Sequence, residues 1–292
     1  MDGRRFFVRR IFKIWPLFYA AFFIYLIYFH LKDNSPSLSR VITEIFFVQD
    51  YFPGFIGITW SLAIEEQFYL LLAILLPICA NSGNLKWVVP TCIAIMITCV
   101  ILRVVHYLYS PIYNGFTYHF PLHLRADSLS AGILIAWYYH FHYEKFRRWV
   151  LSRTTFLALT ALIFLFPVFM FPYFNPWMFT IGFTSVWIGY SSIVILFIFL
   201  PSASARWNYL FNRNKLVLLV AWIGFYSYAI YLFHILIGPM VQNQLFMSTW
   251  KLAPLPVRFI VYLAANILFG YLISSIIEQP ILKWRDKVFP SR

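Results

Sequence analysis

The chain has 292 residues, of which 62% are hydrophobic and only 11% are charged, and its net charge is +13. A soluble domain needs roughly a quarter of its residues charged to cover its surface, so this composition excludes a soluble globular fold, and the apolar excess also excludes a disordered chain. Excess Lys and Arg are typical of cytoplasmic loops beside anionic lipid, and we expect no nucleic-acid partner.

Apolar segments of about 20 residues, long enough to cross a bilayer, recur along the chain. We predict an all-α integral membrane protein with eight transmembrane helices in one bundle and a single domain over residues 1–292. With the N-terminus inside, 17 of the 23 Lys and Arg fall in cytoplasmic segments, which places both termini in the cytoplasm. The predicted spans are residues 14–31, 61–79, 87–109, 126–141, 155–173, 177–200, 216–239 and 256–277.

Ionisable residues inside membrane spans are costly to bury and therefore mark candidate functional positions. In the predicted topology they share one depth, the outer half of the membrane, and they are Glu65, Glu66, Arg103, His106, Arg125, Asp127, His234 and Arg258. This clustering predicts a polar cavity near the outer face. The alternative is that these groups form buried ion pairs that fix helix register, or extend to the interface.

Glu65 is the strongest candidate for acid–base chemistry. In the run Trp60-Ser61-Leu62-Ala63-Ile64-Glu65-Glu66-Gln67-Phe68-Tyr69, residues Ser61, Glu65, Phe68 and Tyr69 recur at helical spacing and share one face. A carboxylate in this apolar setting could act as a general acid or base, or hold the catalytic base in place. His234 is a weaker candidate, because a histidine near the end of a span also fits an interfacial hydrogen-bonding role.

Two further segments have distinctive polar residues. The basic start of the chain includes Arg9, Arg10 and Lys13, and it fits the excess of positive charge expected on the cytoplasmic side of a membrane. It also fits a phosphate site for a nucleotide-bearing donor, because arginine binds phosphate bidentately. Segment 41–57 is apolar but carries Glu44 and Asp50, which predicts an interfacial or re-entrant loop. The cysteines have no metal-ligand spacing such as Cys-x-x-Cys, so we predict no metal site.

Five motifs, in this order along the chain, resemble those of the membrane acyltransferase family 3, a family of integral-membrane O-acyltransferases. The most specific is Trp-Ser-Leu-x-x-Glu-x-x-Phe-Tyr at residues 60–69. The others are the basic run Arg9-Arg10-Ile11-Phe12-Lys13-Ile14-Trp15-Pro16, the segment Arg125-Ala126-Asp127-Ser128-Leu129 with Gly132, the helix Tyr226-Ser227-Tyr228-Ala229-Ile230-Tyr231-Leu232-Phe233-His234, and the closing Ile277-Glu278-Gln279-Pro280.

The resemblance implies transfer of an acyl group from acyl-CoA, with acetyl-CoA as the expected donor, to a hydroxyl of a surface polysaccharide or lipid-linked sugar. It implies a multi-pass protein of the cell membrane, specifically the bacterial inner membrane, with no permanently bound cofactor. The implied catalytic residues are Glu65, His234 and Asp127, and the implied acyl-donor-binding residues are Arg9, Arg10 and Lys13. The implied substrate-binding residues are Trp60, Ser61, Tyr69, Arg103, Arg125 and Tyr228.

The chain departs from the family pattern in two ways. Lys13 stands where the family usually has a second arginine, so a bidentate contact becomes a point charge. The family also usually has ten spans. Two of them would precede the basic run, and the first of these two usually carries a basic residue and the histidine taken as the catalytic base. Three interpretations stay open: an N-terminally incomplete enzyme, an enzyme whose partner supplies two spans, or an inactive relative. Outside the enzyme class, a glycan or lipid transporter and a structural membrane subunit are alternatives.

Overall fold

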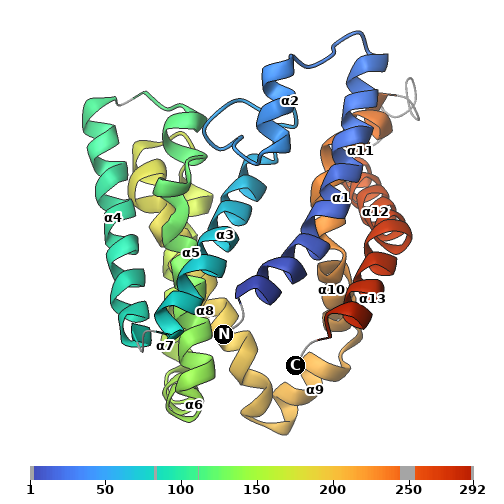
Figure 1. The fold of residues 1–292 in the computed structure, drawn as a ribbon. Coiled ribbons are helices and arrows are strands. Elements are labelled where there is room, and N and C mark those ends of the chain that lie inside the picture. Colours follow the sequence, from blue (N-terminus) through green and yellow to red (C-terminus); the bar gives the residue numbers. More distant parts are fainter. Residues whose placement is uncertain (1–2, 82–83, 111, 244–253, 291–292) are drawn as a thin grey trace. The chain divides into compact units, whose positions relative to one another are not determined.

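The computed structural model describes residues 3–81, 84–110, 112–243 and 254–290, and every regular element in these residues is a helix (Figure 1). The all-helical prediction is therefore confirmed for them. The α-helices are α1 (Gly3–Leu31), α2 (Leu38–Ile45), α3 (Trp60–Asn81), α4 (Val88–Tyr109), α5 (Leu122–Phe141), α6 (Tyr143–Leu151), α7 (Thr154–Met170), α8 (Phe183–Phe199), α9 (Ala205–Arg213), α10 (Lys215–Phe225), α11 (Ser227–Asn243), α12 (Leu255–Ile273) and α13 (Gln279–Val288).

Within the described residues, four continuous helices are long and apolar enough to cross a membrane, and two sharply bent pairs would raise the number to six. The number of eight spans and the cytoplasmic placement of both termini stay predictions. The four are Gly3–Leu31, Leu85–Tyr109, Met178–Ser202 and Leu255–Val288, and the bent pairs are α6 with α7 (77°) and α10 with α11 (72°).

The bend between α10 and α11 corrects the prediction of one continuous span over residues 216–239. The amide of Tyr226 donates to the carbonyl of Ile223, three residues back, and the carbonyl of Tyr226 then accepts from Ile230 in the next helix. The chain therefore turns tightly at Tyr226, although the sequence is apolar on both sides of it. An unbroken apolar run shows that a segment prefers lipid, but it does not show where the helix axis changes direction.

The chain divides into two compact units. The first contains residues 47–53 and 60–217, and the second contains residues 3–46, 54–59 and 218–290 of the described chain. The single domain over residues 1–292 stays a prediction, because a division into compact units does not define the boundaries of a family domain.

In the first unit, α7 and α8 form a closely packed hairpin. A Cβ atom at Gly189 of α8 would lie 2.6 Å from the Cγ of Leu165, so only glycine permits this approach. The hydroxyl of Ser185 donates to the carbonyl of Phe164 at 2.6 Å and joins the two helices again. Small residues and hydroxyl bonds of this kind are how helices associate in lipid, where burial of apolar surface gives no driving force.

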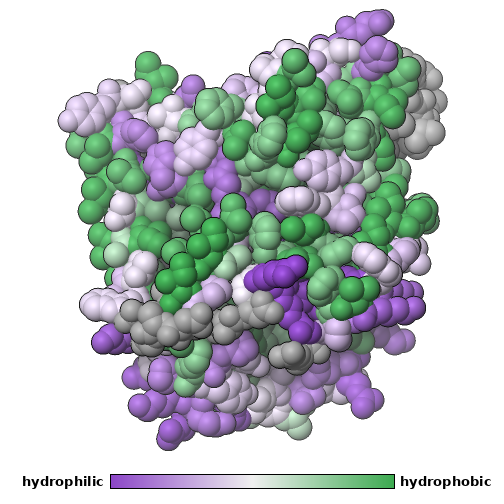
Figure 2. Space-filling view, in the orientation of Figure 1, coloured by the Kyte–Doolittle hydropathy of each residue, from purple (hydrophilic) through white to green (hydrophobic). Residues whose placement is uncertain are grey.

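Helix α4 of the same unit has the outer face expected of a lipid-facing helix. Ile93, Ile97 and Ile101 recur every four residues and are all exposed, whereas Cys99 and Arg103 on its other side are buried. Figure 2 shows hydrophobic residues along this helix and hydrophilic residues gathered at the end of the unit where α6 lies. This distribution supports a membrane-embedded unit.

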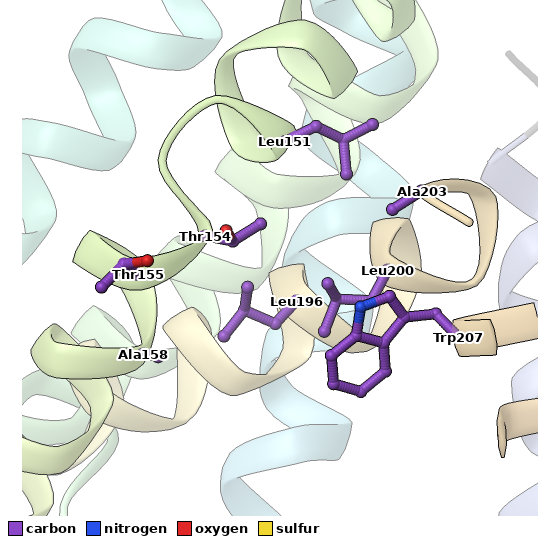
Figure 3. Close-up of a pocket in the computed structure, with 8 residues that line it drawn as sticks. All are labelled: Leu151, Thr154, Thr155, Ala158, Leu196, Leu200, Ala203 and Trp207. Atoms are coloured by element: carbon purple, nitrogen blue, oxygen red, sulfur yellow. The ribbon is translucent and has the colours of Figure 1, made fainter.

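The α6–α7 corner and the end of α8 border an open cavity of about 530 Å³. Figure 3 shows side chains from α7, α8 and the start of α9 around it, and none of its lining residues is charged. They are Leu151, Thr154, Thr155, Ala158, Leu196, Leu200, Ala203 and Trp207.

In the second unit, α11 and α12 approach as closely as α7 and α8 do. A Cβ atom at Gly270 of α12 would lie 2.4 Å from a side-chain atom of Ile230 and 2.9 Å from its backbone nitrogen. Helix α1 is attached to α11 by side-chain-to-backbone bonds, since the hydroxyl of Tyr25 donates to the carbonyl of Leu232 at 3.0 Å. Both contacts join segments more than 30 residues apart in the sequence.

Candidate functional site

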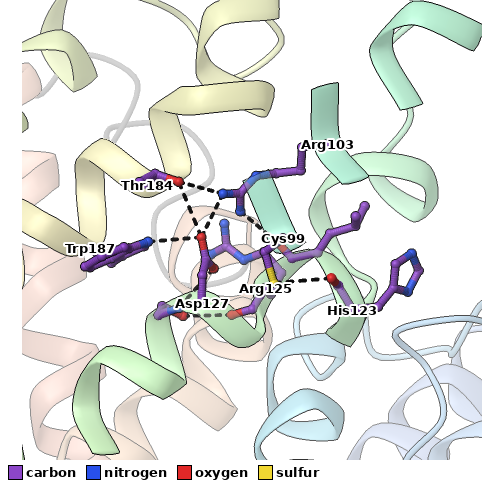
Figure 4. A network of polar contacts seen from close by, with 9 residues as sticks. Cys99, Arg103, His123, Arg125, Asp127, Thr184 and Trp187 are labelled. Atoms are coloured by element: carbon purple, nitrogen blue, oxygen red, sulfur yellow. Dashed lines mark hydrogen bonds and ion pairs between the residues drawn. The ribbon is translucent and has the colours of Figure 1, made fainter. Parts of the chain in front are cut away.

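A buried ion pair joins α4, α5 and α8 in the first unit (Figure 4). Arg103 has no exposed surface, and its Nη2 lies 2.7 Å from Oδ2 of Asp127. The same nitrogen donates to Oγ1 of Thr184 at 2.6 Å, and Nη1 donates to the carbonyl of Leu124 at 2.7 Å. The predicted topology has Arg103 and Asp127 at one depth, and the structure brings them into direct contact.

The carboxylate of Asp127 has several donors. Besides Arg103, the indole Nε1 of Trp187 donates to Oδ2 at 3.0 Å, and the amide of Ser128 donates to Oδ1 at 2.9 Å. Thr184 and Trp187 lie three residues apart on α8, so they present neighbouring groups to the same carboxylate. A carboxylate with this many donors is held in one orientation, which suits it to fix Arg103 and α8 in place.

Arg125, in the first turn of α5, is held differently. Its guanidinium carbon lies 4.2 Å from the ring centroid of Phe183. Among the residues that the structure describes, none accepts a hydrogen bond from this guanidinium or lies within ion-pair distance of it. Figure 4 shows it between Asp127 and His123. An arginine stacked on an aromatic ring with its N–H groups unused by protein acceptors is suited to bind a ligand oxygen.

Aromatic residues continue from Phe183 to the start of the 60–69 motif. The ring of His119 lies 5.0 Å from Phe183 and 4.8 Å from Trp60, and Trp60 stacks on Phe120 at 4.7 Å. Trp60 and Arg125, both predicted to bind substrate, thus belong to one aromatic and cationic cluster, which we call the Trp60–Arg125 cluster (Trp60, His119, Phe120, Phe183 and Arg125).

His119 lies in a short turn, Gly115–His119, before α5. Burial and the neighbouring charge of Arg125 lower the pKa of His119 to about 4, so its ring is neutral at pH 7. Its Nδ1 is buried with no hydrogen-bond partner among the described residues. A neutral imidazole in this position can accept or donate a hydrogen bond to a bound hydroxyl.

Glu65 and Tyr69 face each other on α3, as their spacing predicts. The hydroxyl of Tyr69 lies 3.5 Å from Oε2 of Glu65, and both side chains are partly exposed. Ser61, one turn before Glu65, is also partly exposed. Gln67, on the same helix, donates to Oδ1 of Asp50 at 2.8 Å and so attaches α3 to the preceding loop. A catalytic role for Glu65 and a substrate-binding role for Ser61 and Tyr69 stay predictions.

The predicted donor-binding residues lie in the second unit and contact the other end of the chain. Lys13 forms an ion pair with Oε1 of Glu278, whose other oxygen accepts from the hydroxyl of Ser274 at 2.6 Å. Arg9 pairs with Asp286 at 3.1 Å and donates to the carbonyl of Phe289. The basic run and the closing Glu-x-Pro motif, 265 residues apart, are therefore joined by the Lys13–Glu278 pair.

Arg10 contacts an aromatic ring of its own helix. Its guanidinium carbon lies 5.6 Å from the ring centroid of Phe6, one turn earlier on α1. Arg9 and Lys13 thus each have an acidic partner on the C-terminal segment, so binding of an anionic donor there would compete with these pairs. Their role in donor binding stays a prediction.

Tyr228 and His234 lie on α11 in the second unit. The hydroxyl of Tyr228 donates to the carbonyl of Ile14 at 2.9 Å and attaches α11 to α1. Nδ1 of His234 lies 2.7 Å from the carbonyl of Tyr231, and because a carbonyl only accepts, this nitrogen carries the proton. In the neutral ring Nε2 is then the nitrogen that can take a proton, as a general base requires. The catalytic role of His234 stays a prediction.

Glu44 anchors the loop that leads into the 60–69 motif. Its fully buried carboxylate accepts from the amides of Phe55 (3.1 Å) and Ile56 (2.9 Å) and from the hydroxyl of Thr59 (2.8 Å to Oε2). The predicted interfacial loop 41–57 thus begins with a helical turn and is closed by this side chain. Burial raises the pKa of Glu44 to about 7, although the bonds from Ile56, Thr59 and Phe55 act in the opposite direction.

We expect this carboxyl group to make stability depend on pH. Its pKa is higher in the folded protein than the ordinary value of 4.5, so the folded state binds the proton more tightly, and stability falls as pH rises from about 4.5 to about 7. At about 1.4 kcal/mol per pKa unit the full difference is on the order of 3 kcal/mol. Thermal unfolding in detergent from pH 5 to 8 measures it.

The matched variant is Glu44→Gln, which keeps an acceptor oxygen and removes the titration. His119 acts with the opposite sign over a similar range, because its lowered pKa makes stability rise with pH. The observable is therefore the difference between the wild-type and Glu44→Gln profiles. Parallel profiles would show that Glu44 does not titrate in this range.

Several residues of these sites have no distinctive signal in the sequence. Thr184, Trp187 and Phe183 carry no charge and lie in an apolar span, so a search for ionisable residues passes over them. His119 lies in a loop, outside the predicted spans. Glu278 was visible in the closing motif, but nothing in the sequence indicates that its partner is Lys13.

The comparisons with known proteins agree with the helical motifs. A family model described as an acyltransferase domain matches residues 1–275. No curated protein and no solved structure matches the chain. The match covers four of the five motifs, because the closing motif at residues 277–280 lies beyond its end, and it confirms the resemblance to this family.

Proposed function

The chain belongs to this acyltransferase family, and from that premise we propose that it moves an acyl group from acyl-CoA, with acetyl-CoA as the donor, to a hydroxyl of a surface polysaccharide or lipid-linked sugar. The protein is a multi-pass membrane acyltransferase that transfers groups other than amino-acyl groups. We propose the bacterial inner membrane as its location.

The Trp60–Arg125 cluster is the observation that supports a sugar hydroxyl as the acceptor. Sugar rings bind aromatic faces through their C–H groups and bind arginine through their hydroxyls. Trp60 and Phe120, which are both partly exposed, provide the aromatic surface. The guanidinium of Arg125, which lies on the buried ring of Phe183, has no protein acceptor among the described residues. In contrast, the guanidinium of Arg103 is occupied by Asp127, Thr184 and Leu124.

In the proposed reaction, the acceptor oxygen attacks the thioester carbonyl, a C–O bond forms and the C–S bond breaks. The hydroxyl proton passes to a base and the leaving thiolate is protonated to free CoA. The step needs that base and a donor that stabilises the oxyanion. We propose Glu65 as the base or the group that positions it, His234 as a second proton-transfer group, and Asp127 as a residue that positions Arg103.

The proposed donor-binding residues are Arg9, Arg10 and Lys13, which would hold the phosphates of CoA. In the structure Arg9 pairs with Asp286 and Lys13 pairs with Glu278. Binding of the donor would therefore exchange these carboxylate partners for phosphate oxygens, which are also anionic acceptors.

Labelled acetyl-CoA added to membranes that contain the protein should label a surface polysaccharide. We expect Glu65→Gln to reduce this labelling at least tenfold, because general acid–base catalysis contributes about 10²–10⁴-fold. The control is Glu144→Gln, which removes an exposed carboxylate on α6. Unchanged labelling in Glu65→Gln would exclude Glu65 from the mechanism, and glycan transport without covalent labelling would favour a transporter.

A further inference from the structure

Helix α6 lies across the end of the spanning helices of the first unit. Its axis turns by 77° from that of α7. Its apolar side is fixed to the unit, because Val150 is fully buried in a cluster with Leu157, Leu196 and Phe199. A short amphipathic helix nearly perpendicular to a membrane-crossing helix lies in the plane of the membrane surface, with its apolar side toward the hydrocarbon.

A cavity of about 690 Å³ opens beside this helix, at the junction of α5 and α6. Its lining is aromatic with one permanent cation, and consists of Tyr138, His142, Lys145, Phe146 and Trp149. Tyr138 and Trp149 are each about 40% exposed. Half-exposed Trp and Tyr are typical of the level of lipid headgroups, where one end of the ring is apolar and the other is wet. The volume lies within the range of ligand sites.

The charges around this cavity are almost all positive. Segment 142–154 carries four basic residues and one acidic residue, Glu144. Arg147 is used structurally, because its Nε and Nη2 donate to the hydroxyl and carbonyl of Ser202. Lys145 and Arg148 are exposed, and neither has a carboxylate within ion-pair distance among the described residues. Lys145, Arg148 and Trp149 share one face of the helix, since they are three and four residues apart.

From this placement we propose that the α5–α6 cavity is a binding site for the headgroup of an anionic phospholipid. Lys145 and Arg148 bind the phosphate, and the rings of Tyr138 and Trp149 border the glycerol and the upper acyl chains. The uncharged cavity of Figure 3, at the α6–α7 corner, lacks the cation that this recognition needs.

The positive charge of α6 favours an anionic lipid over a second copy of the chain as the occupant of this site. A symmetric dimer through this face would bring the basic residues of one α6 against the same residues of the other. Like charges in contact are unfavourable, whereas the anionic leaflet attracts each Lys or Arg near its surface. The site is independent of the acyl acceptor and of the transfer chemistry.

The test is native mass spectrometry of the purified full chain with phosphatidylglycerol and, separately, phosphatidylcholine. We expect retained phosphatidylglycerol to exceed phosphatidylcholine, and Lys145→Ala with Arg148→Ala to weaken phosphatidylglycerol binding by about fivefold for each charge removed. The matched control is Lys32→Ala with Lys86→Ala, which removes two exposed lysines from other segments. Acyl transfer measured in the same samples separates lipid binding from activity.

Three outcomes would overturn the proposal. Equal retention of the two lipids would show that no anionic headgroup is selected. An equal effect of the Lys145/Arg148 and Lys32/Lys86 variants would assign the effect to net charge alone. A dimer cross-linked between cysteines placed at Trp149 of two copies would show that the face is covered by a second chain. Because all four substituted residues are exposed, we expect both variants to fold.

Discussion

Replacement of Asp127 with asparagine is expected to lower the free energy of unfolding by about 3–5 kcal/mol, because it leaves the charge of Arg103 buried without a counterion. Arg103 has no exposed surface, and its one carboxylate partner among the described residues is Asp127, at 2.7 Å. The variant also weakens the attachment of α8 through Trp187. Thermal unfolding of the purified protein in detergent, with the monodisperse fraction as a second measure, tests this.

The control is Asp33→Asn, in an exposed turn where the backbone φ of 52° suits asparagine as well as aspartate. We expect it to leave the unfolding midpoint unchanged. The double variant Arg103→Met with Asp127→Leu removes both charges and should recover most of the lost stability, because an apolar pair of similar volume replaces a buried ion pair at little cost. A stable Asp127→Asn protein would show that the ion pair does not hold these helices together.

Arg125→Met, unlike Asp127→Asn, is expected to stay folded and to lower acyl transfer by roughly 10- to 100-fold. Arg125 has no ion-pair partner among the described residues, so its removal costs only the stacking on Phe183, about 0.5–2 kcal/mol. A charged hydrogen bond to the acceptor is worth about 1.5–3 kcal/mol, and every 1.4 kcal/mol corresponds to a factor of ten. The measurement is transfer from labelled acetyl-CoA at several acceptor concentrations, alongside thermal unfolding.

Two further variants define the role of this guanidinium. Arg125→Lys keeps the charge and loses the planar fork, so we expect intermediate activity. Arg206→Met removes an exposed arginine of α9 and should leave transfer unchanged. Full activity in Arg125→Met would exclude Arg125 from acceptor binding, and loss of folding in it would assign Arg125 to the structural network of Arg103.

Depth in the membrane, inferred from the sequence, predicts part of this site. It placed Arg103, Arg125 and Asp127 together, and the structure joins them around Phe183. It could not separate the two arginines, because that distinction depends on Thr184 and Trp187. Uncharged residues of an apolar span have no individual signal in a sequence. Thr184 and Trp187 also lie about 60 to 80 residues along the chain from the charged residues that they contact.

The sequence by itself determined that the chain is helical, membrane-embedded and a member of an acyltransferase family. These properties are local: a spanning helix makes its backbone hydrogen bonds within its own segment, so composition and length predict it. Only the tertiary structure decided the bend at Tyr226, the pairing of Lys13 with Glu278, and which arginine Asp127 neutralises. Those depend on which helices pack together, and in lipid that choice is made by close packing and polar contacts between distant residues.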